Sequence, residues 1–237
     1  MNNRISGSLD YYFKKKEYLL TNIGKPAGNN FSNQIVANVG DMENQGVEVL
    51  LNLTPVKTKN TTWDFGVNFT YQKNEITNLT AVTDPNYPGN KFGGISGGTG
   101  NTILINSVGY KRGAFYAYKQ IYDQAGKPIE GLFEDINRDG IINDKDLYRS
   151  KGIDPTFLLG FNTNVQYRKW NAGFVMRANI GQYMYNNINS STGTSRNILN
   201  PLNYLANGSS DILNSGITGF STDYYLSDYY IQNASFL

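Results

Sequence analysis

The stretch FLLGFNTNVQYRKWNAGFVMRANI, residues 157–180, decides the fold that this sequence predicts. Apolar and polar residues alternate on both sides of Arg168 and Lys169, and such alternation is typical of a β-strand with one apolar and one polar face. A two-residue turn there makes Tyr167 and Trp170 cross-strand partners, so both apolar sets fall on one face. Each strand is about 11 residues, a length that crosses a bilayer at a tilt.

The same period of two recurs along the chain, most clearly in Trp63, Phe65, Val67, Phe69 and Tyr71. Eight strands are expected in total, at 4–14, 45–54, 62–72, 101–107, 113–122, 157–167, 170–181 and 224–237. Long polar stretches separate them, at about 19–44, 73–100, 123–156 and 182–223. Short turns alternating with long loops, and aromatic residues at strand ends, favour a transmembrane β-barrel over a soluble β-sandwich, which would show the same alternation.

Composition excludes several other classes of protein. The 237 residues contain no cysteine and no histidine, so thiolate, disulfide and imidazole chemistry are absent. The net charge of +2 does not indicate a binder of nucleic acid or of an anionic membrane. No apolar run approaches the length of a transmembrane helix. The glycine-rich segment at 93–100 follows no strand-to-helix pattern, and no carboxylate pair is singled out as catalytic, so we expect no enzyme.

One segment carries the chemistry of a site: DINRDGIINDKD, residues 135–146. It matches a calcium-binding EF-hand loop through four residues, Asp135, Asn137, Asp139 and Gly140. Such a loop curls so that alternate side chains converge on a hard cation, which prefers six to eight oxygen ligands.

The carbonyl of Ile141, the side chain of Asn143 and the carboxylate of Asp146 would complete the ligand set. A structural Ca²⁺ is therefore predicted, on the extracellular side of the membrane. The alternative is an aspartate-rich turn without an ion. The sequence after the loop does not predict an exiting helix, which a helix–loop–helix calcium sensor would need. The expected role of the ion is therefore to stiffen a long loop.

Several segments, in order, resemble the SusC/RagA family of TonB-linked outer-membrane proteins. They are NRISGSLDYY at 3–12, NVGDMENQGVEV at 38–49, GAFYAY at 113–118, FEDINRDGIIND at 133–144 and NASFL at 233–237. The resemblance implies an all-β, antiparallel transmembrane barrel of roughly 22 strands with long extracellular loops, of which this chain supplies about eight strands. We expect residues 1–237 to be one partial barrel, without a plug domain, TonB box or signal peptide.

The resemblance also implies a location in the cell outer membrane and a role in nutrient import. The implied partners are the remainder of the barrel and its plug, a SusD-like surface lipoprotein, the TonB–ExbBD complex, outer-membrane lipid, and an oligosaccharide or peptide substrate. Nucleic acid is not expected. Two alternatives remain at this point: a soluble calcium-stabilised β-sandwich that binds a ligand, and an independent eight-stranded barrel.

Overall fold

The computed structural model describes residues 4–24, 34–82, 84–96, 98–198, 204–221 and 223–237. The chain divides into two compact units. Unit 1 consists of Met1–Tyr87, Asp154–Gln182 and Ala234–Leu237, and unit 2 consists of Pro88–Ile153 and Tyr183–Asn233. Among the described residues, no helix is long and apolar enough to cross a membrane.

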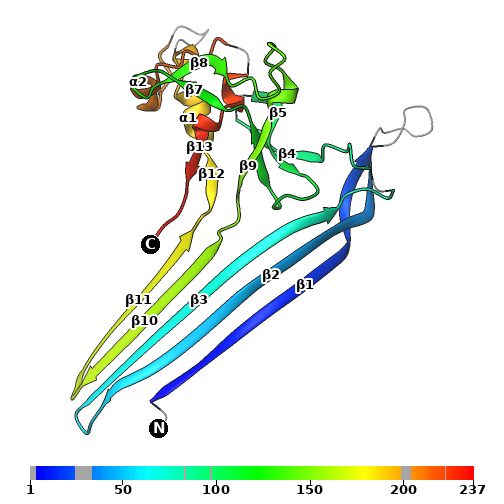
Figure 1. Ribbon diagram of the computed structural model, residues 1–237. Coiled ribbons are helices and arrows are strands. Elements are labelled where there is room, and N and C mark those ends of the chain that lie inside the picture. Colours follow the sequence, from blue (N-terminus) through cyan, green and yellow to red (C-terminus); the bar gives the residue numbers. More distant parts are fainter. Residues whose placement is uncertain (1–3, 25–33, 83, 97, 199–203, 222) are drawn as a thin grey trace. The chain divides into compact units, whose positions relative to one another are not determined.

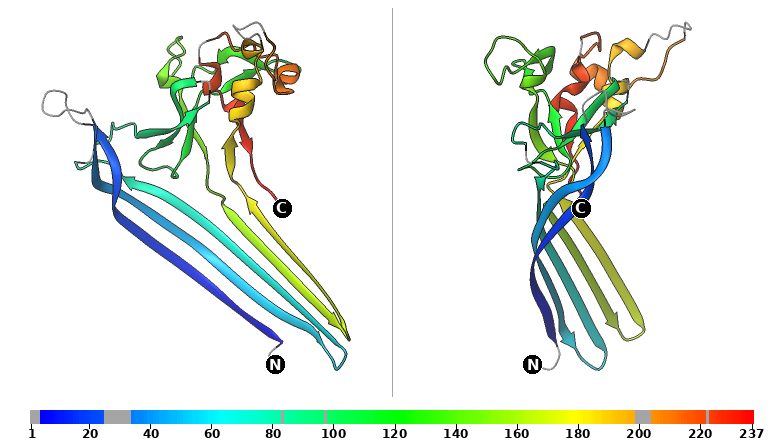
Figure 2. Two further views of the ribbon diagram at one scale, coloured as in Figure 1. Left: turned by 180° about the vertical axis from the view of Figure 1, so that it is seen from behind. Right: turned by 90° about the vertical axis from the view of Figure 1, so that its right-hand side faces the viewer.

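Unit 1 is built on one antiparallel sheet with the strand order β1-β2-β3-β10-β11 (Figure 1). Its strands are β1 (Ile5–Gly24), β2 (Gln34–Lys57), β3 (Thr61–Asn78), β10 (Phe157–Tyr167) and β11 (Trp170–Ile180). The hairpin of β10 and β11 has the predicted register, with Tyr167 opposite Trp170. In both views of Figure 2 the five strands run side by side.

The first three strands are longer than the sequence predicts, at 20, 24 and 18 residues. They extend into the polar ranges 19–44 and 73–100, which we expected to be loops. The reason is that backbone pairing continues beyond the zone where hydropathy alternates, for example between Asn22 and Val36. The register shifts between Leu53 and Val56, around Pro55, because proline lacks the N–H group that a regular ladder needs.

Five of the eight expected strands lie in this sheet, and the other three ranges fold differently. The ranges 101–107 and 113–122 contribute to two smaller sheets in unit 2. Most of the range 224–237 is not a strand, because it contains the 3₁₀ helices η3 (Tyr224–Leu226) and η4 (Asp228–Tyr230) before the short β13 (Ile231–Asn233). Its aromatic residues pack into a core instead of alternating between two faces.

Unit 2 combines short strands with irregular segments. A four-stranded antiparallel sheet has the order β4-β5-β6-β9, and two further pairs are β7-β8 and β12-β13. The strands are β4 (Asn90–Ile95), β5 (Gly98–Asn106), β6 (Ala114–Ala117), β7 (Gln120–Tyr122), β8 (Pro128–Phe133), β9 (Tyr148–Gly152) and β12 (Tyr183–Tyr185). The helices are η1 (Asp144–Asp146), α1 (Asn187–Thr192), η2 (Ser195–Asn197) and α2 (Asp211–Ser215).

Two clusters of buried side chains form the core of unit 2. The larger one includes Ile103, Phe115 and Tyr118, and the smaller one is formed by Ile217, Tyr224 and Tyr230. Phe115 is 1% exposed and Tyr230 is fully buried. Unit 2 therefore has an apolar interior of its own.

Candidate functional site

One face of the five-stranded sheet is apolar from edge to edge. Residues that pair directly across antiparallel strands share a face, and the observed register brings the apolar positions of all five strands together. They include Leu9, Tyr11, Val47, Val49, Leu51, Val67, Phe69, Leu159, Phe161, Phe174 and Met176. Many of these side chains are exposed, Leu9 by 75% and Phe174 by 54%.

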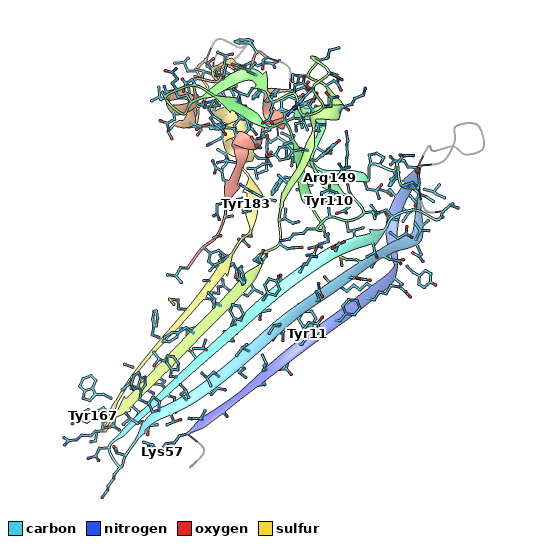
Figure 3. The ribbon with its side chains drawn as sticks, in the orientation of Figure 1. Tyr11, Lys57, Tyr110, Arg149, Tyr167 and Tyr183 are labelled. Atoms are coloured by element: carbon cyan, nitrogen blue, oxygen red, sulfur yellow. The ribbon has the colours of Figure 1, made fainter. Side chains whose placement is uncertain are left out.

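Neighbouring rings on this face contact one another. Phe65 meets Phe161 edge to face at 5.0 Å between centroids, and Phe161 lies 6.1 Å from Phe174. An exposed apolar face that crosses five strands is unstable in water but suits the hydrocarbon of a bilayer. Figure 3 shows side chains projecting along the whole length of the sheet.

The opposite face is polar. It carries Ser8, Asp10, Glu48, Asn52, Asp64, Asn68, Thr70, Asn162, Asn164, Gln166 and Arg177, with Leu50, Leu158 and Val175 among the apolar exceptions. The register places Asn68, Asn162, Asn164 and Arg177 together on the side opposite the apolar face. This face suits a water-filled lumen.

Two asparagine–glycine pairs lie crosswise on the polar face, where Asn68 is opposite Gly160 and Asn162 is opposite Gly66. A Cβ atom on Gly66 would lie 2.6 Å from the Asn162 side-chain nitrogen, and a Cβ atom on Gly160 would overlap the amide of Asn68. Each glycine thus makes room for the asparagine on the neighbouring strand. This packing keeps polar amide groups close to the sheet at mid-strand.

Aromatic residues mark the end of the sheet at the short turns, as predicted. Trp63, Tyr167 and Trp170 lie on the apolar face there, and Trp170 is 80% exposed. The indole N–H of Trp63 donates to the Thr163 hydroxyl at 2.7 Å. Such rings are characteristic of the boundary between a membrane and water.

The acidic loop of unit 2 forms the compact turn that its spacing predicts. The Asp135 carboxylate accepts the N–H groups of Asp139 at 3.2 Å and Gly140 at 2.8 Å. The side chains of Asn137 and Asp139 each accept the N–H group two residues later, at 3.0 and 2.9 Å. Gly140 has φ +82°, a conformation that favours glycine.

Asp146 closes the loop from inside. It is fully buried, and its oxygens accept the N–H groups of Asn143 at 2.9 Å, Ile136 at 3.0 Å and Asn137 at 3.4 Å. The N–H of Asn143, followed by those of Asn137 and Ile136, outweighs burial and lowers the pKa of Asp146 below its ordinary value. Asn143 in turn caps η1, which is a single turn and not an exiting helix, as expected.

The six predicted calcium ligands therefore belong to one ordered loop, and every donor is an oxygen, which suits a hard cation. The carboxylates of Asp135, Asp139 and Asp146 bond backbone N–H groups of this loop. The Ile141 carbonyl accepts the Asn143 side-chain amide at 3.2 Å. In the part of the chain that the structure describes, no three acidic side chains gather closely enough to hold a metal ion.

Glu130 connects two distant segments of unit 2, and it was not identified from the sequence. Its carboxylate accepts the N–H and hydroxyl of Thr218, both at 2.6 Å, and the N–H groups of Gly219 at 2.9 Å and Ser221 at 3.0 Å. Burial alone would raise the pKa of Glu130, but the Thr218 hydroxyl and these N–H groups together lower it. Glu130 thus fastens β8 to the loop at 218–221, which is distant in sequence.

Arg149 is a second tie within unit 2 that sequence reasoning missed. Its guanidinium lies over the rings of Tyr110 and Tyr116, at 5.2 and 5.1 Å from their centroids. It also donates to the Ser107 hydroxyl at 2.8 Å and to the Pro88 carbonyl at 2.6 Å. Figure 3 labels Arg149 and Tyr110 within unit 2. No local sequence pattern brings these four partners together, because they come from separate segments.

An open antiparallel sheet with one exposed apolar face, one polar face and an aromatic border defines a segment of a transmembrane β-barrel wall. Residues 1–131 match the family model described as TonB dependent receptor-like, beta-barrel. This chain belongs to the β-barrel family of TonB-dependent receptors, which are outer-membrane proteins, and the predicted fold class, family and location are thereby confirmed.

Two curated relatives are similar over most of the chain. The TonB-dependent receptor SusC of Bacteroides thetaiotaomicron is 37% identical over 238 residues, which cover 100% of this chain and 24% of that receptor. The TonB-dependent receptor P26 of Formosa agariphila is 30% identical over 196 residues, or 78% of this chain and 19% of that receptor. The chain therefore spans about a quarter or less of the length of these relatives, which are receptors and not enzymes.

Solved structures share the fold. The RagAB peptide transporter aligns with a TM-score of 0.66 at 23% identity, covering 99% of this chain and 26% of that one. The RagAB peptide importer in its open-open state aligns with a TM-score of 0.67 at 21% identity, covering 99% and 25%. The soluble β-sandwich alternative is inconsistent with this family and with the exposed apolar face.

Proposed function

We propose that this chain forms part of the wall of a TonB-dependent outer-membrane transporter that imports oligosaccharides or peptides together with a SusD-like lipoprotein. The observation that carries the proposal is the five-stranded sheet, whose register gives it one mainly apolar and one mainly polar face. Its polar face would line the passage, and its neighbours would be the remaining barrel strands and the plug. Energy would come from the TonB–ExbBD complex.

Both substrate classes are implied by the family resemblance. Among the relatives, RagAB is described as a peptide transporter, which supports the peptide class. The polar face carries amide and hydroxyl groups, which hydrogen-bond to glycans and to peptides alike, so it favours neither class of substrate. Growth of cells that depend on the full-length protein, on glycans or on peptides as the limiting nutrient, distinguishes the two classes.

A cysteine-labelling experiment tests the passage itself. The chain contains no cysteine, so Asn162→Cys and its neighbour Phe161→Cys can be introduced singly into the full-length receptor. A bulky maleimide on residue 162 should reduce uptake strongly, because this side chain faces the lumen. The same reagent should leave uptake through the Phe161→Cys variant unchanged. Equal uptake through labelled and unlabelled Asn162→Cys would contradict the proposal, as would uptake that persists in cells lacking TonB.

We also infer that the loop at 135–146 binds one Ca²⁺ through Asp135, Asn137, Asp139, Ile141, Asn143 and Asp146. The all-oxygen donor set and the spacing support this, and a modest affinity of about 10⁻⁴–10⁻³ M would suffice outside the cell. The ion would stiffen the loop and relieve repulsion between its carboxylates. It would have no role in a chemical reaction.

Limited proteolysis of the full-length protein, with and without a chelator, tests the ion. Calcium should slow cleavage within 123–156, and Asp135→Ala should remove this protection while the hairpin at 157–180 stays intact. Asp123→Ala is a matched control, because Asp123 also closes a turn by accepting N–H groups, from Ala125 and Lys127, but lies outside the motif. Cleavage that is independent of calcium in the unmodified protein would show that the loop is only a turn.

A further inference from the structure

Five basic residues that are scattered through the sequence lie together at the turn end of the sheet. They are Arg4, Lys57, Lys59, Arg168 and Lys169, which we call the turn rim. The N–H of Thr54 donates to the Arg4 carbonyl at 2.7 Å, and the N–H of Arg168 donates to the Asn60 carbonyl at 2.8 Å. The pairing of β1, β2, β3, β10 and β11 thus places all five basic residues at the same end of the strands, where Figure 3 labels Lys57 and Tyr167.

No acidic partner balances the turn rim within the described residues. All five residues are exposed, and none of them forms an ion pair with a carboxylate there. The nearest acid in the strands, Asp64, points to the polar face and accepts the Thr54 hydroxyl at 2.7 Å. The rim therefore presents concentrated positive charge, although the whole chain has a net charge of only +2.

The far end of the same strands has a different charge pattern. There Lys15 pairs with Glu17 at 2.7 Å, and Lys73 pairs with Glu75 at 3.1 Å. Lys15 also lies opposite Glu43 on the neighbouring strand, so acidic residues stand close to the lysines at that end. The imbalance is specific to the turn end and is not a general property of the sheet.

Exposed aromatic rings place the turn rim at a definite depth. Trp63, Tyr167 and Trp170 lie on the apolar face, next to the turns, and Tyr167 and Trp170 immediately flank Arg168 and Lys169. A strand rises about 3.4 Å per residue, so the backbones of Arg168 and Lys169 lie within about 7 Å of those of Tyr167 and Trp170. Aromatic rings settle at the membrane interface, and the long stems of lysine and arginine reach the headgroup layer from there.

We propose that the turn rim binds the phosphate headgroups of anionic phospholipids in the periplasmic leaflet of the outer membrane. Short turns mark the periplasmic end of such a barrel, and lysine and arginine are both effective binders of phosphate. The partner must be amphipathic, because Arg168 lies over the ring of Tyr167, 5.4 Å from its centroid, and Lys169 is followed directly by Trp170 on the lipid-facing surface. An acidic protein segment would match the charge but not the rings. The net charge of +2 did not indicate an anionic membrane partner, because a sum over the whole chain does not show that basic residues cluster at one place.

The site depends on the location in the outer membrane and does not depend on which substrate is imported. Each cation near an anionic surface strengthens binding by at most about fivefold, and salt screening reduces this factor, so removing four should lower the preference for anionic lipid by at least about tenfold. The test variant is Lys57→Gln, Lys59→Gln, Arg168→Gln and Lys169→Gln combined. Arg4 stays unchanged, because its guanidinium donates to the Lys57 carbonyl at 3.4 Å.

The experiment uses the full-length receptor in vesicles of phosphatidylethanolamine and phosphatidylglycerol that contain about 25% anionic lipid. Native mass spectrometry counts the lipids of each kind that stay bound after extraction. A matched control removes four lysines at the far end: Lys14→Gln, Lys15→Gln, Lys16→Gln and Lys73→Gln. Heat-modifiable migration on a gel verifies that both variants are folded.

The unmodified receptor and the far-end control should retain phosphatidylglycerol preferentially, and the turn-rim variant should not. Added glycerol phosphate should displace little of the lipid, because it lacks acyl chains. The proposal is overturned if the turn-rim variant keeps the same lipid ratio, or if the control loses as much. It is equally overturned if glycerol phosphate competes on equal terms, which would indicate a simple anion site.

Discussion

The two units of this chain differ in where their apolar side chains lie: unit 1 exposes them on one face of its sheet, and unit 2 buries a set of them in its core. In unit 1, Phe174 and Leu9 are 54% and 75% exposed on the apolar face of the sheet. In unit 2, Phe115 is 1% exposed and Tyr230 is fully buried. The same residue types are used in both, so the difference reflects the surrounding solvent, which is hydrocarbon for unit 1 and water for unit 2.

The two units also differ in how their backbones are held. In the sheet, strand pairing satisfies the backbone groups almost continuously. In unit 2, polar side chains do much of this work. Gln120 donates to the carbonyls of Ile121, Ile129 and Leu132, while Glu130 and Asp146 accept clusters of N–H groups. An irregular fold therefore depends on individual polar residues, whereas a barrel wall depends on register.

The largest expected effect comes from the core of unit 2. Phe115→Ala should destabilise this unit by about 3–5 kcal/mol, because it removes a ring from a tightly packed cluster. The full-length receptor should keep its membrane strands while proteases cut unit 2 rapidly. Chemical denaturation followed by proteolysis measures both. Phe174→Ala is the control, since its side chain faces lipid, and an equal loss there would contradict the difference between the units.

A charge on the apolar face should have the next largest effect. Phe161→Arg should cost about 2–4 kcal/mol, because the guanidinium would face hydrocarbon near mid-membrane. Asn162→Arg, one residue further along, should be tolerated on the polar face. Urea unfolding in lipid vesicles measures both variants. If the two arginines cost the same, the assignment of the faces is wrong.

The smallest effect concerns Glu130 and its dependence on pH. Because its folded pKa is lowered from the ordinary value of 4.5, its contribution is present above that pH and is lost as the pH falls through the lowered pKa. Local opening of the loop at 218–221 should therefore increase about two- to tenfold in acid. Hydrogen exchange measures the opening. Glu130→Gln should open more easily at neutral pH and respond little to acid, and an unchanged acid response would contradict this role.

The parts of the fold that the sequence predicts are those with local contrast between two faces. The hairpin at 157–180 has strict alternation and a two-residue turn, so even its register is predictable. The parts of β1 and β2 that lie within 19–44 could not be predicted, because both of their faces carry polar residues and the alternation disappears. Tyr224–Tyr230 misled the prediction, since aromatic residues that pack around a core resemble those of a strand.

The acidic loop shows a similar division. Its spacing predicts the turn around Gly140 and predicts that Asp135, Asn137 and Asp139 belong to that turn. The complete burial of Asp146 depends on the backbone of residues 136–143 wrapping around it, which no spacing rule contains. Glu130 and Arg149 could not be predicted, because their partners lie in distant segments that meet only in the folded unit.

The sheet of unit 1 has one face in lipid and one face in water. Spin labels at position 174 and position 177 of β11 test this arrangement directly in the full-length receptor, with oxygen as a lipid-soluble quencher and a nickel chelate as a water-soluble one. The label replacing Phe174 should respond mainly to oxygen, and the label replacing Arg177 mainly to the nickel chelate. Equal accessibility of both positions to both quenchers would contradict the account of this sheet as a barrel wall.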